Sequence, residues 1–161
     1  MNAIRIFTVG GTIDKIYFDA KSRYEVGPPN ISEILGGLTL NPDFEVVSLM
    51  QKDSLEMTDE DRQIVHAAVA AADEPRIIIT HGTDTMVQTA AELASIAGKT
   101  IVLTGALEPA GFKTSDAMFN IGAAMTAVQT LPAGVYITMN GAVFDHDKVV
   151  KDVEQGRFVA L

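Results

Sequence analysis

Residues 76–86 read RIIITHGTDTM. Three isoleucines in a row, at 77–79, form a short β-branched run bounded by turn residues, which is typical of a strand buried on both faces. Residues 80–85 are mostly polar, and apolar residues then recur three or four positions apart over 86–97 before Gly98. That spacing is typical of an amphipathic helix with a glycine stop. The stretch therefore predicts a strand, a polar turn and a helix.

The polar turn has the position of a ligand site. In open α/β sheets, ligands bind at the carboxyl ends of the strands. The start of a helix there offers free backbone N–H groups and a partial positive charge. Thr83, Asp84 and Thr85 lie at this point. Taken one at a time, the simplest interpretation is that Asp84 caps the helix and the threonines cap the turn.

The same alternation continues along the chain. Thr58 and Asn30 are placed to cap two of the helices. Alternating strands and helices predict an α/β fold in three layers: a doubly wound, mainly parallel sheet of Rossmann or flavodoxin-like type, with helices on both faces. We expect strands at 3–9, 44–50, 76–80, 100–104 and 134–139, and helices at 30–35, 58–73, 86–97 and 116–130.

Two segments do not follow this alternation. Residues 15–26 predict a hairpin, which is either a mobile flap over the preceding turn or an ordinary surface hairpin. Residues 140–161 are mostly polar and predict only a weak helical tendency.

Composition excludes several classes of protein. The chain has 161 residues, which suits one domain, and a net charge of −9, which disfavours nucleic acid and anionic membranes as partners. No apolar run is long enough to span a membrane, and the amino terminus lacks a signal-peptide pattern, so we expect a cytoplasmic location. The absence of cysteine excludes a thiolate metal site and a cysteine nucleophile.

The candidate chemistry lies at one edge of the predicted sheet. The carboxyl ends of parallel strands meet there, so the polar residues that follow the strands converge: Thr12, Ser54, Thr83, Asp84 and Asn140. The paired glycines before Thr12 allow a tight turn and a close approach to a ligand. They lack the third glycine of a dinucleotide fingerprint and the GKS or GKT of a phosphate loop.

A threonine hydroxyl must lose its proton before it can attack a substrate. It needs a base, or a relay in which a lysine amine is held by a carboxylate. Asp84 is the obvious carboxylate. Sequence spacing alone leaves four candidate lysines, Lys99, Lys113, Lys148 and Lys151.

Two short motifs carry a resemblance to a known family. Residues 9–13 (VGGTI) and 80–85 (THGTDT) resemble the two signature motifs of the bacterial-type L-asparaginase/glutaminase family. Residues 24–27, 53–58 and 140–151 resemble its flap, its substrate-binding serine loop and its catalytic-lysine segment, so the likeness covers nearly the whole chain. The resemblance implies hydrolysis of L-asparagine to L-aspartate and ammonia, without a metal or an organic cofactor.

The resemblance also implies roles for individual residues. Thr12 is the nucleophile that forms an acyl-enzyme, and Tyr24 helps to take its proton. Thr83, Asp84 and Lys151 form a second hydroxyl–carboxylate–amine relay. Ser54 and Asp84 hold the α-carboxylate and the α-ammonium of the substrate. The substrate-binding set is Gly11, Asp53, Ser54, Thr83 and Asp84.

The chain also departs from the family pattern. Family members are about twice as long and have a second, C-terminal domain that supplies an acidic residue to a neighbouring subunit's site. We expect residues 1–161 to form a single asparaginase-like catalytic domain without it, as a homodimer or homotetramer. Leu55 stands where many relatives have a polar residue. We therefore expect weaker binding of asparagine, with Glu25 or Glu56 as candidates to replace the missing acid.

Other interpretations stay open. L-Glutamine is an alternative substrate, and a non-catalytic protein that binds an amino acid or amide is an alternative function. A nucleotide-binding domain rests on fold analogy alone. We expect His81 to be a structural hydrogen-bonding residue, and residues 145–147 (DHD) to form a solvated turn and not a metal site.

Overall fold

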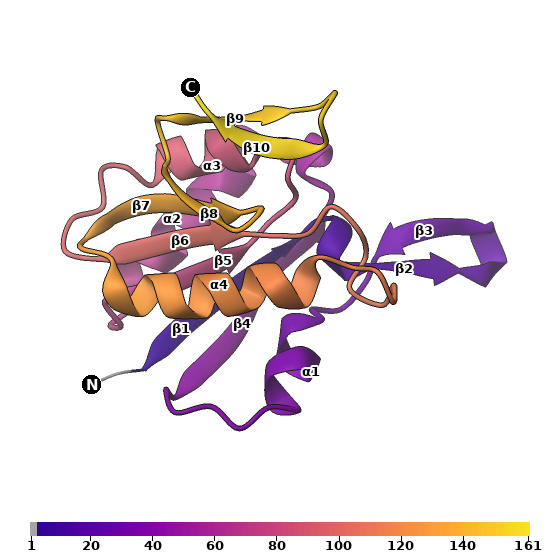
Figure 1. Cartoon of the computed structure of the whole chain (residues 1–161), viewed down its shortest axis with the longest axis horizontal. Helices are drawn as coiled ribbons and strands as arrows, with labels where there is room; N and C mark the ends of the chain where they lie inside the picture. Colours follow the sequence, from indigo (N-terminus) through magenta and orange to yellow (C-terminus); the bar gives the residue numbers. More distant parts are fainter. Residues whose placement is uncertain (1–2) are drawn as a thin grey trace.

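The computed structural model describes residues 3–161 and has a central sheet of six strands (Figure 1). The strand order is β4-β1-β5-β6-β7-β8, and all neighbours are parallel except β7 and β8. The first five strands have the flavodoxin-like order, whose ligand crevice lies where the chain reverses direction in the sheet, between β1 and β5. The strands are β1 (Ile4–Gly10), β4 (Phe44–Lys52), β5 (Arg76–Thr80), β6 (Thr100–Thr104), β7 (Gly134–Met139) and β8 (Ala142–Asp145).

Helices cover both faces of the sheet, as the sequence predicts. Helices α2 (Asp59–Ala71) and α3 (Met86–Glu92) pack on one face, and α1 (Ile31–Gly36) and α4 (Ala117–Thr130) on the other. Ile77 and Ile79 belong to the first core and Ile78 to the second, because successive side chains of a strand point to opposite faces. The α/β prediction is confirmed.

Two small hairpins lie outside the central sheet (Figure 1). Strands β2 (Lys15–Phe18) and β3 (Arg23–Val26) pair only with each other, and this hairpin projects from the body of the molecule. Strands β9 (Val149–Asp152) and β10 (Arg157–Ala160) form the second, which lies near α3. Short 3₁₀ turns complete the chain: η1 (Thr12–Asp14), η2 (Asp19–Lys21) and η3 (Ser54–Glu56).

Two local predictions are wrong. Residues 140–161 form β8, β9 and β10 and no helix, because Val149 and Phe158 are only 3% exposed and pack into the core next to α3. Helix α3 ends at Glu92 and does not reach residue 97, because the following N–H groups bond three residues back, as Leu93 does to Ala90. In residues 140–161, packing overrides the local pattern.

Thr58 caps α2 as predicted. Its hydroxyl accepts a hydrogen bond from the backbone N–H of Asp61, and the Asp61 carboxylate accepts one from the N–H of Thr58. Within residues 3–161, no helix has the length and apolar character needed to cross a membrane.

Candidate active site

The turns after β1, β4 and β5 are in van der Waals contact. A Cβ atom added to Gly11 would lie 2.4 Å from both the Cα and the N of Gly82, and one added to Gly82 would lie 2.7 Å from the Ser54 Oγ. Only residues without a side chain allow this approach. The contact brings the segments of Thr12, Ser54 and Thr83 together at the β1–β5 crevice.

Lys151 joins this edge from the far end of the sequence. Its Nζ donates to the Thr83 Oγ1 at 2.8 Å and to the Asp84 Oδ1 at 2.8 Å. Thr83 is 6% exposed, and the Lys151 side chain is 19% exposed. The Asn140 Oδ1 accepts the Phe158 N–H at 2.8 Å and so ties the β9–β10 hairpin to the end of β7.

The other candidate lysines have different surroundings. The Lys99 Nζ donates to the carbonyls of Ala72 and Glu74, which precede β5 at the opposite edge of the sheet. Lys148 forms an exposed ion pair with Asp145. Lys113 lies exposed in the loop before α4. Of the four lysines, Lys151 is therefore the one that meets Thr83 and Asp84.

The capping interpretation of Asp84 is wrong. The N-cap residue of α3 is Thr85, and no side chain forms a cap hydrogen bond there. The Asp84 carboxylate faces Lys151, and the Thr85 hydroxyl donates to the backbone carbonyl of Ser54 at 2.9 Å. The Ser54 hydroxyl is buried and accepts the Thr85 N–H at 3.3 Å.

Thr12 and Tyr24 are not joined. Thr12 begins η1 and is partly exposed, whereas Tyr24 is 48% exposed on β3. The Tyr24 ring packs against Tyr17, with centroids 5.4 Å apart, and Phe112, with centroids 5.7 Å apart. Within residues 3–161, no hydrogen bond links Thr12 to Tyr24 or to Lys151.

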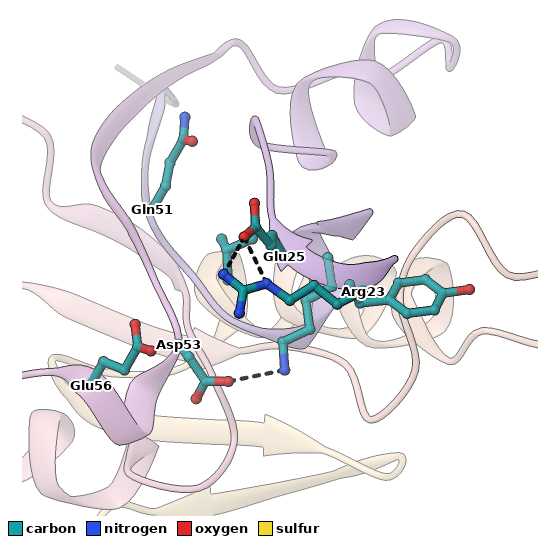
Figure 2. Close-up of a pocket in the computed structure, with 8 residues that line it drawn as sticks. Arg23, Glu25, Gln51, Asp53 and Glu56 are labelled. Atoms are coloured by element: carbon teal, nitrogen blue, oxygen red, sulfur yellow. Dashed lines mark hydrogen bonds and ion pairs between the residues drawn. The ribbon is translucent and has the colours of Figure 1, made fainter. Parts of the chain in front are cut away.

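A cavity of about 460 Å³ lies between the β2–β3 hairpin and the end of β4 (Figure 2). Two ion pairs cross or line it: Lys15 with Asp53 at 2.9 Å, and Arg23 with Glu25 at 2.9 Å. Glu56 also lines it and forms no ion pair with any residue from 3 to 161. The lining residues are Lys15, Arg23, Tyr24, Glu25, Val26, Gln51, Asp53 and Glu56.

Asp53 is ionised within this cavity. Partial burial favours the neutral form, but the Leu55 N–H at 3.0 Å, the Lys15 ammonium and the charge of Lys151 together hold the pKa of Asp53 below its ordinary value. Asp53 is therefore already paired with a cation, whereas Glu56 has no ion-pair partner among residues 3–161.

His81 has the structural role that the sequence predicts. Its Nδ1 lies 2.6 Å from the Gly82 carbonyl and its Nε2 lies 2.7 Å from the Thr89 Oγ1, which accepts from Arg62. A carbonyl can only accept, so Nδ1 carries the proton and Nε2 accepts from the Thr89 hydroxyl. Complete burial lowers the pKa of His81 to about 4. The neutral ring thus holds the carbonyl of Gly82, the glycine that contacts Gly11.

Sequence reasoning missed Asp14. This carboxylate is 2% exposed and accepts the backbone N–H of Asn30 at 2.8 Å. Burial raises the pKa of Asp14 from its ordinary 3.8 to about 6, although the hydrogen-bonding groups of Asn30 act in the opposite direction. An aspartate in a predicted turn gives no sign of such burial. Within residues 3–161, no three histidine, aspartate or glutamate side chains are grouped so that they could hold a metal ion.

Comparison with known proteins identifies the family of this chain. Residues 3–157 match the family described as "Asparaginase, N-terminal". The chain belongs to the asparaginase family. It is 30% identical to L-asparaginase 2 of Escherichia coli (strain K12) over 92% of its own length and 46% of that protein. The probable cytoplasmic L-asparaginase of Campylobacter jejuni has a similar structure, with a TM-score of 0.77 and 28% identity, over 99% of this chain and 52% of that one.

A shorter part of the chain also matches a protein of a different name. A component of the glutamyl-tRNA(Gln) amidotransferase of Methanococcus vannielii is 42% identical over 71 residues, which are 43% of this chain and 17% of that protein. This asparaginase-family chain thus spans about half the length of the E. coli and C. jejuni proteins, and the matches cover its whole central sheet.

Proposed function

We propose that this chain is an amidohydrolase that converts L-asparagine to L-aspartate and ammonia through a threonine acyl-enzyme. One observation carries the proposal: Lys151 lies 2.8 Å from both the Thr83 hydroxyl and the Asp84 carboxylate, although 67 residues separate Lys151 from Asp84. A hydroxyl, an amine and a carboxylate in contact form a relay that can move a proton. Family membership supports amide hydrolysis as the reaction.

The proposed reaction has two steps. The Thr12 Oγ forms a bond to the side-chain amide carbon while its proton leaves through Tyr24. The C–N bond then breaks, and the nitrogen takes a proton and departs as ammonia. A water molecule next attacks the Thr12 ester and gives one proton to the relay of Thr83, Lys151 and Asp84. The relay returns this proton to the Thr12 Oγ as the ester C–O bond breaks. The products are aspartate and the free Thr12 hydroxyl.

Substrate binding is proposed at the surrounding strand ends. Ser54 and Asp84 would hold the α-carboxylate and α-ammonium, with Asp53, Gly11 and Thr83 lining the site. Asp84 already shares its charge with Lys151, so a second acid would strengthen ammonium binding. Glu56 is a better candidate than Glu25 for that acid, because Lys21 and Arg23 hold Glu25.

Other parts of the proposal concern the whole protein. We propose that residues 1–161 suffice for catalysis, and that the protein is cytoplasmic and forms a homodimer or homotetramer. The name of the Campylobacter jejuni relative, a probable cytoplasmic L-asparaginase, supports the compartment. Light scattering after gel filtration tests the assembly, and cell fractionation tests the location.

The decisive experiment measures ammonia release from L-asparagine and L-glutamine. We expect release from asparagine, and a fall of about 10³-fold or more in both Thr12→Ala and Thr83→Ala. Thr39→Ala, at an exposed loop residue, is the matched control. Added hydroxylamine should divert the acyl-enzyme into a hydroxamate. Circular dichroism checks that each variant folds.

The alternatives give different results. A preference for glutamine would agree with the name of the Methanococcus vannielii relative. If the folded chain binds an amino acid in calorimetry but releases no ammonia, it is the non-catalytic binding protein. Ammonia release that is unchanged in Thr12→Ala would contradict the role of Thr12 as the nucleophile.

A further inference from the structure

Asp14 lies buried at the base of the β2–β3 hairpin. It is the last residue of η1, the turn that begins at Thr12, and it directly precedes the first residue of β2. The hairpin carries Tyr24, so Asp14 lies between the proposed nucleophile and its proton acceptor along the chain. The proposed hydrolysis does not use the Asp14 carboxylate.

Three hydrogen bonds connect Asp14 to both ends of the hairpin. Its backbone N–H donates to the Gly11 carbonyl at 3.1 Å, and its carbonyl accepts the N–H of Gly27, just beyond β3, at 2.8 Å. Its Oδ1 accepts the N–H of Asn30 at 2.8 Å. One residue therefore ties the turn of Thr12 to the segment that follows the hairpin.

Two side-chain contacts of the hairpin are partly exposed. Lys15 and Asp53 form an ion pair whose side chains are 27% and 29% exposed, and Tyr24 touches Phe112 in a loop. Partly exposed ion pairs contribute little to stability. Losing a buried hydrogen bond costs more stability, because the remaining donor or acceptor stays buried without a partner.

No positively charged side chain among residues 3–161 is paired with the Asp14 carboxylate. Within residues 3–161 it forms no ion pair, and the adjacent Lys15 is engaged with Asp53. Only the backbone and side-chain groups of Asn30 favour the charged carboxylate. A buried carboxylate without a counter-ion is expensive, and here Asn30 supplies its polar contacts at the base of a projecting hairpin, with the backbone N–H at 2.8 Å.

We propose that Asp14 is a positioning residue that anchors the β2–β3 hairpin and so sets the place of Tyr24 relative to Thr12. The catalytic part rests on the proposed function, whereas the anchoring part does not. The bond to Asn30 needs an acceptor oxygen, which asparagine also supplies. Asp14→Asn should therefore keep the anchor, and Asp14→Ala should lose it.

Limited trypsin digestion tests the anchor without any assay of activity. Lys21 and Arg23 lie on the exposed hairpin, and Arg76 lies at the start of a core strand. We expect Asp14→Ala to raise cleavage at the two hairpin sites about 10-fold, the fold-change for losing one buried hydrogen bond, with cleavage at Arg76 unchanged. Asp14→Asn should be cleaved no faster than the original chain, and the exposed hairpin control Asp19→Ala should match the original chain.

A second variant removes the same bond from the donor side. The φ of Asn30 is −79°, which proline can adopt, so Asn30→Pro deletes the N–H and keeps the φ of this residue. Asn30→Ala keeps the N–H and is its control. If Asp14→Ala does not fold, the comparison of Asn30→Pro with Asn30→Ala tests whether this hydrogen bond anchors the hairpin. Unchanged hairpin cleavage in the variants that lose the bond, or equal cleavage in Asp14→Asn and Asp14→Ala, would overturn the anchor.

Kinetics tests the link to Tyr24. We expect Asp14→Ala to lower kcat, and Asp14→Asn to restore it. Adding Tyr24→Phe to Asp14→Ala should cost less than it does in the original chain, because Tyr24 is already displaced. Fully additive losses would contradict the positioning role. A chain that hydrolyses no amide would remove the proposed function and leave the digestion result to decide the anchor.

Discussion

The two halves of the candidate site are held in different ways. Thr83, Asp84 and Lys151 are in direct contact, and their segments are fixed by a core strand and by a hairpin that packs into the core. Thr12 and Tyr24 lie on either side of Asp14, and Tyr24 projects on a hairpin whose two strands pair only with each other.

This difference fits what each half has to do. In the proposed reaction, the relay keeps a fixed geometry for proton transfer, whereas the half that carries Tyr24 has to admit the substrate. Segments that move in catalysis are drawn from the less stable parts of a fold. The contrast predicts that changes in the relay remove chemistry, and that changes in the hairpin alter access and alignment.

Removing Lys151 should have the largest effect. We expect Lys151→Met to lower kcat/KM for asparagine about 10³-fold, within the range for general acid–base groups, while the melting temperature changes little. Lys148→Met is the matched control, since Lys148 lies nearby in sequence on an exposed ion pair. If kcat/KM falls ten-fold or less in Lys151→Met, the contact of Thr83, Asp84 and Lys151 does not carry the proton transfer.

The next largest effect is on stability. Asp14 has a higher pKa in the folded chain than its ordinary 3.8, so the folded state binds the proton more tightly, and stability falls as pH rises from about 4 to about 6. Two pKa units correspond to about 3 kcal/mol. Asp14→Asn should therefore raise the free energy of unfolding at pH 7.5 by up to about that amount and leave it unchanged below pH 4. Urea unfolding at both pH values measures this difference.

The titration of His81 changes the stability of the fold with pH in the direction opposite to that of Asp14. Its pKa is lower in the folded chain than its ordinary 6.5, so its contribution to stability is lost as pH falls from about 6.5 to about 4. Removing the Asp14 titration should therefore make stability rise more steeply with pH over this range. A pH dependence identical in Asp14→Asn and the original chain would show that the base of the hairpin is not a desolvated site.

Removing the hydroxyl of Tyr24 tests the half of the site that contains Thr12 and Tyr24. Tyr24→Phe keeps the ring contacts with Tyr17 and Phe112 and deletes only the phenol oxygen. We expect kcat/KM to fall about 10²-fold without a change in stability. Tyr17→Phe is the control, because Tyr17 pairs with Tyr24 across the hairpin. Equal behaviour of the two variants would exclude a proton-transfer role for Tyr24.

The smallest expected effect concerns the cavity beside the hairpin. If Glu56 holds the α-ammonium, Glu56→Gln should raise KM for asparagine about 10-fold, the value of one charge-assisted hydrogen bond. KM for succinamic acid, which lacks the ammonium, should not change. Glu25→Gln is the control, since Lys21 and Arg23 occupy Glu25. A KM for succinamic acid that rises equally would contradict a specific ammonium contact.

The sequence was sufficient to predict the fold and the turn that carries Thr83 and Asp84. The isoleucine run 77–79 and its polar turn predict β5 and the turn after it, and the structure has both there. Spacing alone could not choose Lys151, because its hairpin takes its place through packing of Val149 and Phe158 in the core. The local pattern of residues 140–161 does not encode those tertiary contacts, and the prediction of a helical tendency failed for the same reason.

Two features of the site could not be predicted at all. The sequence places Asp14 in a turn, where aspartate is ordinary, and its burial depends on Asn30 from beyond the hairpin. The pairing of Asp53 with Lys15 likewise depends on where the hairpin projects. The assigned roles of Thr12, Tyr24 and the substrate-binding residues stay predictions until the variants are measured.

The contact between Gly11 and Gly82 has a consequence for substrate range. Backbone touches backbone there, so the spacing of the two threonine-bearing turns equals the thickness of two peptide chains and no side chain can adjust it. Selection for longer or shorter amides cannot act by widening this gap, since even one methyl group would collide with the facing strand end. In the proposed reaction, new substrates would have to be accommodated away from this contact, for example by replacing Leu55, which follows Ser54 and is exposed.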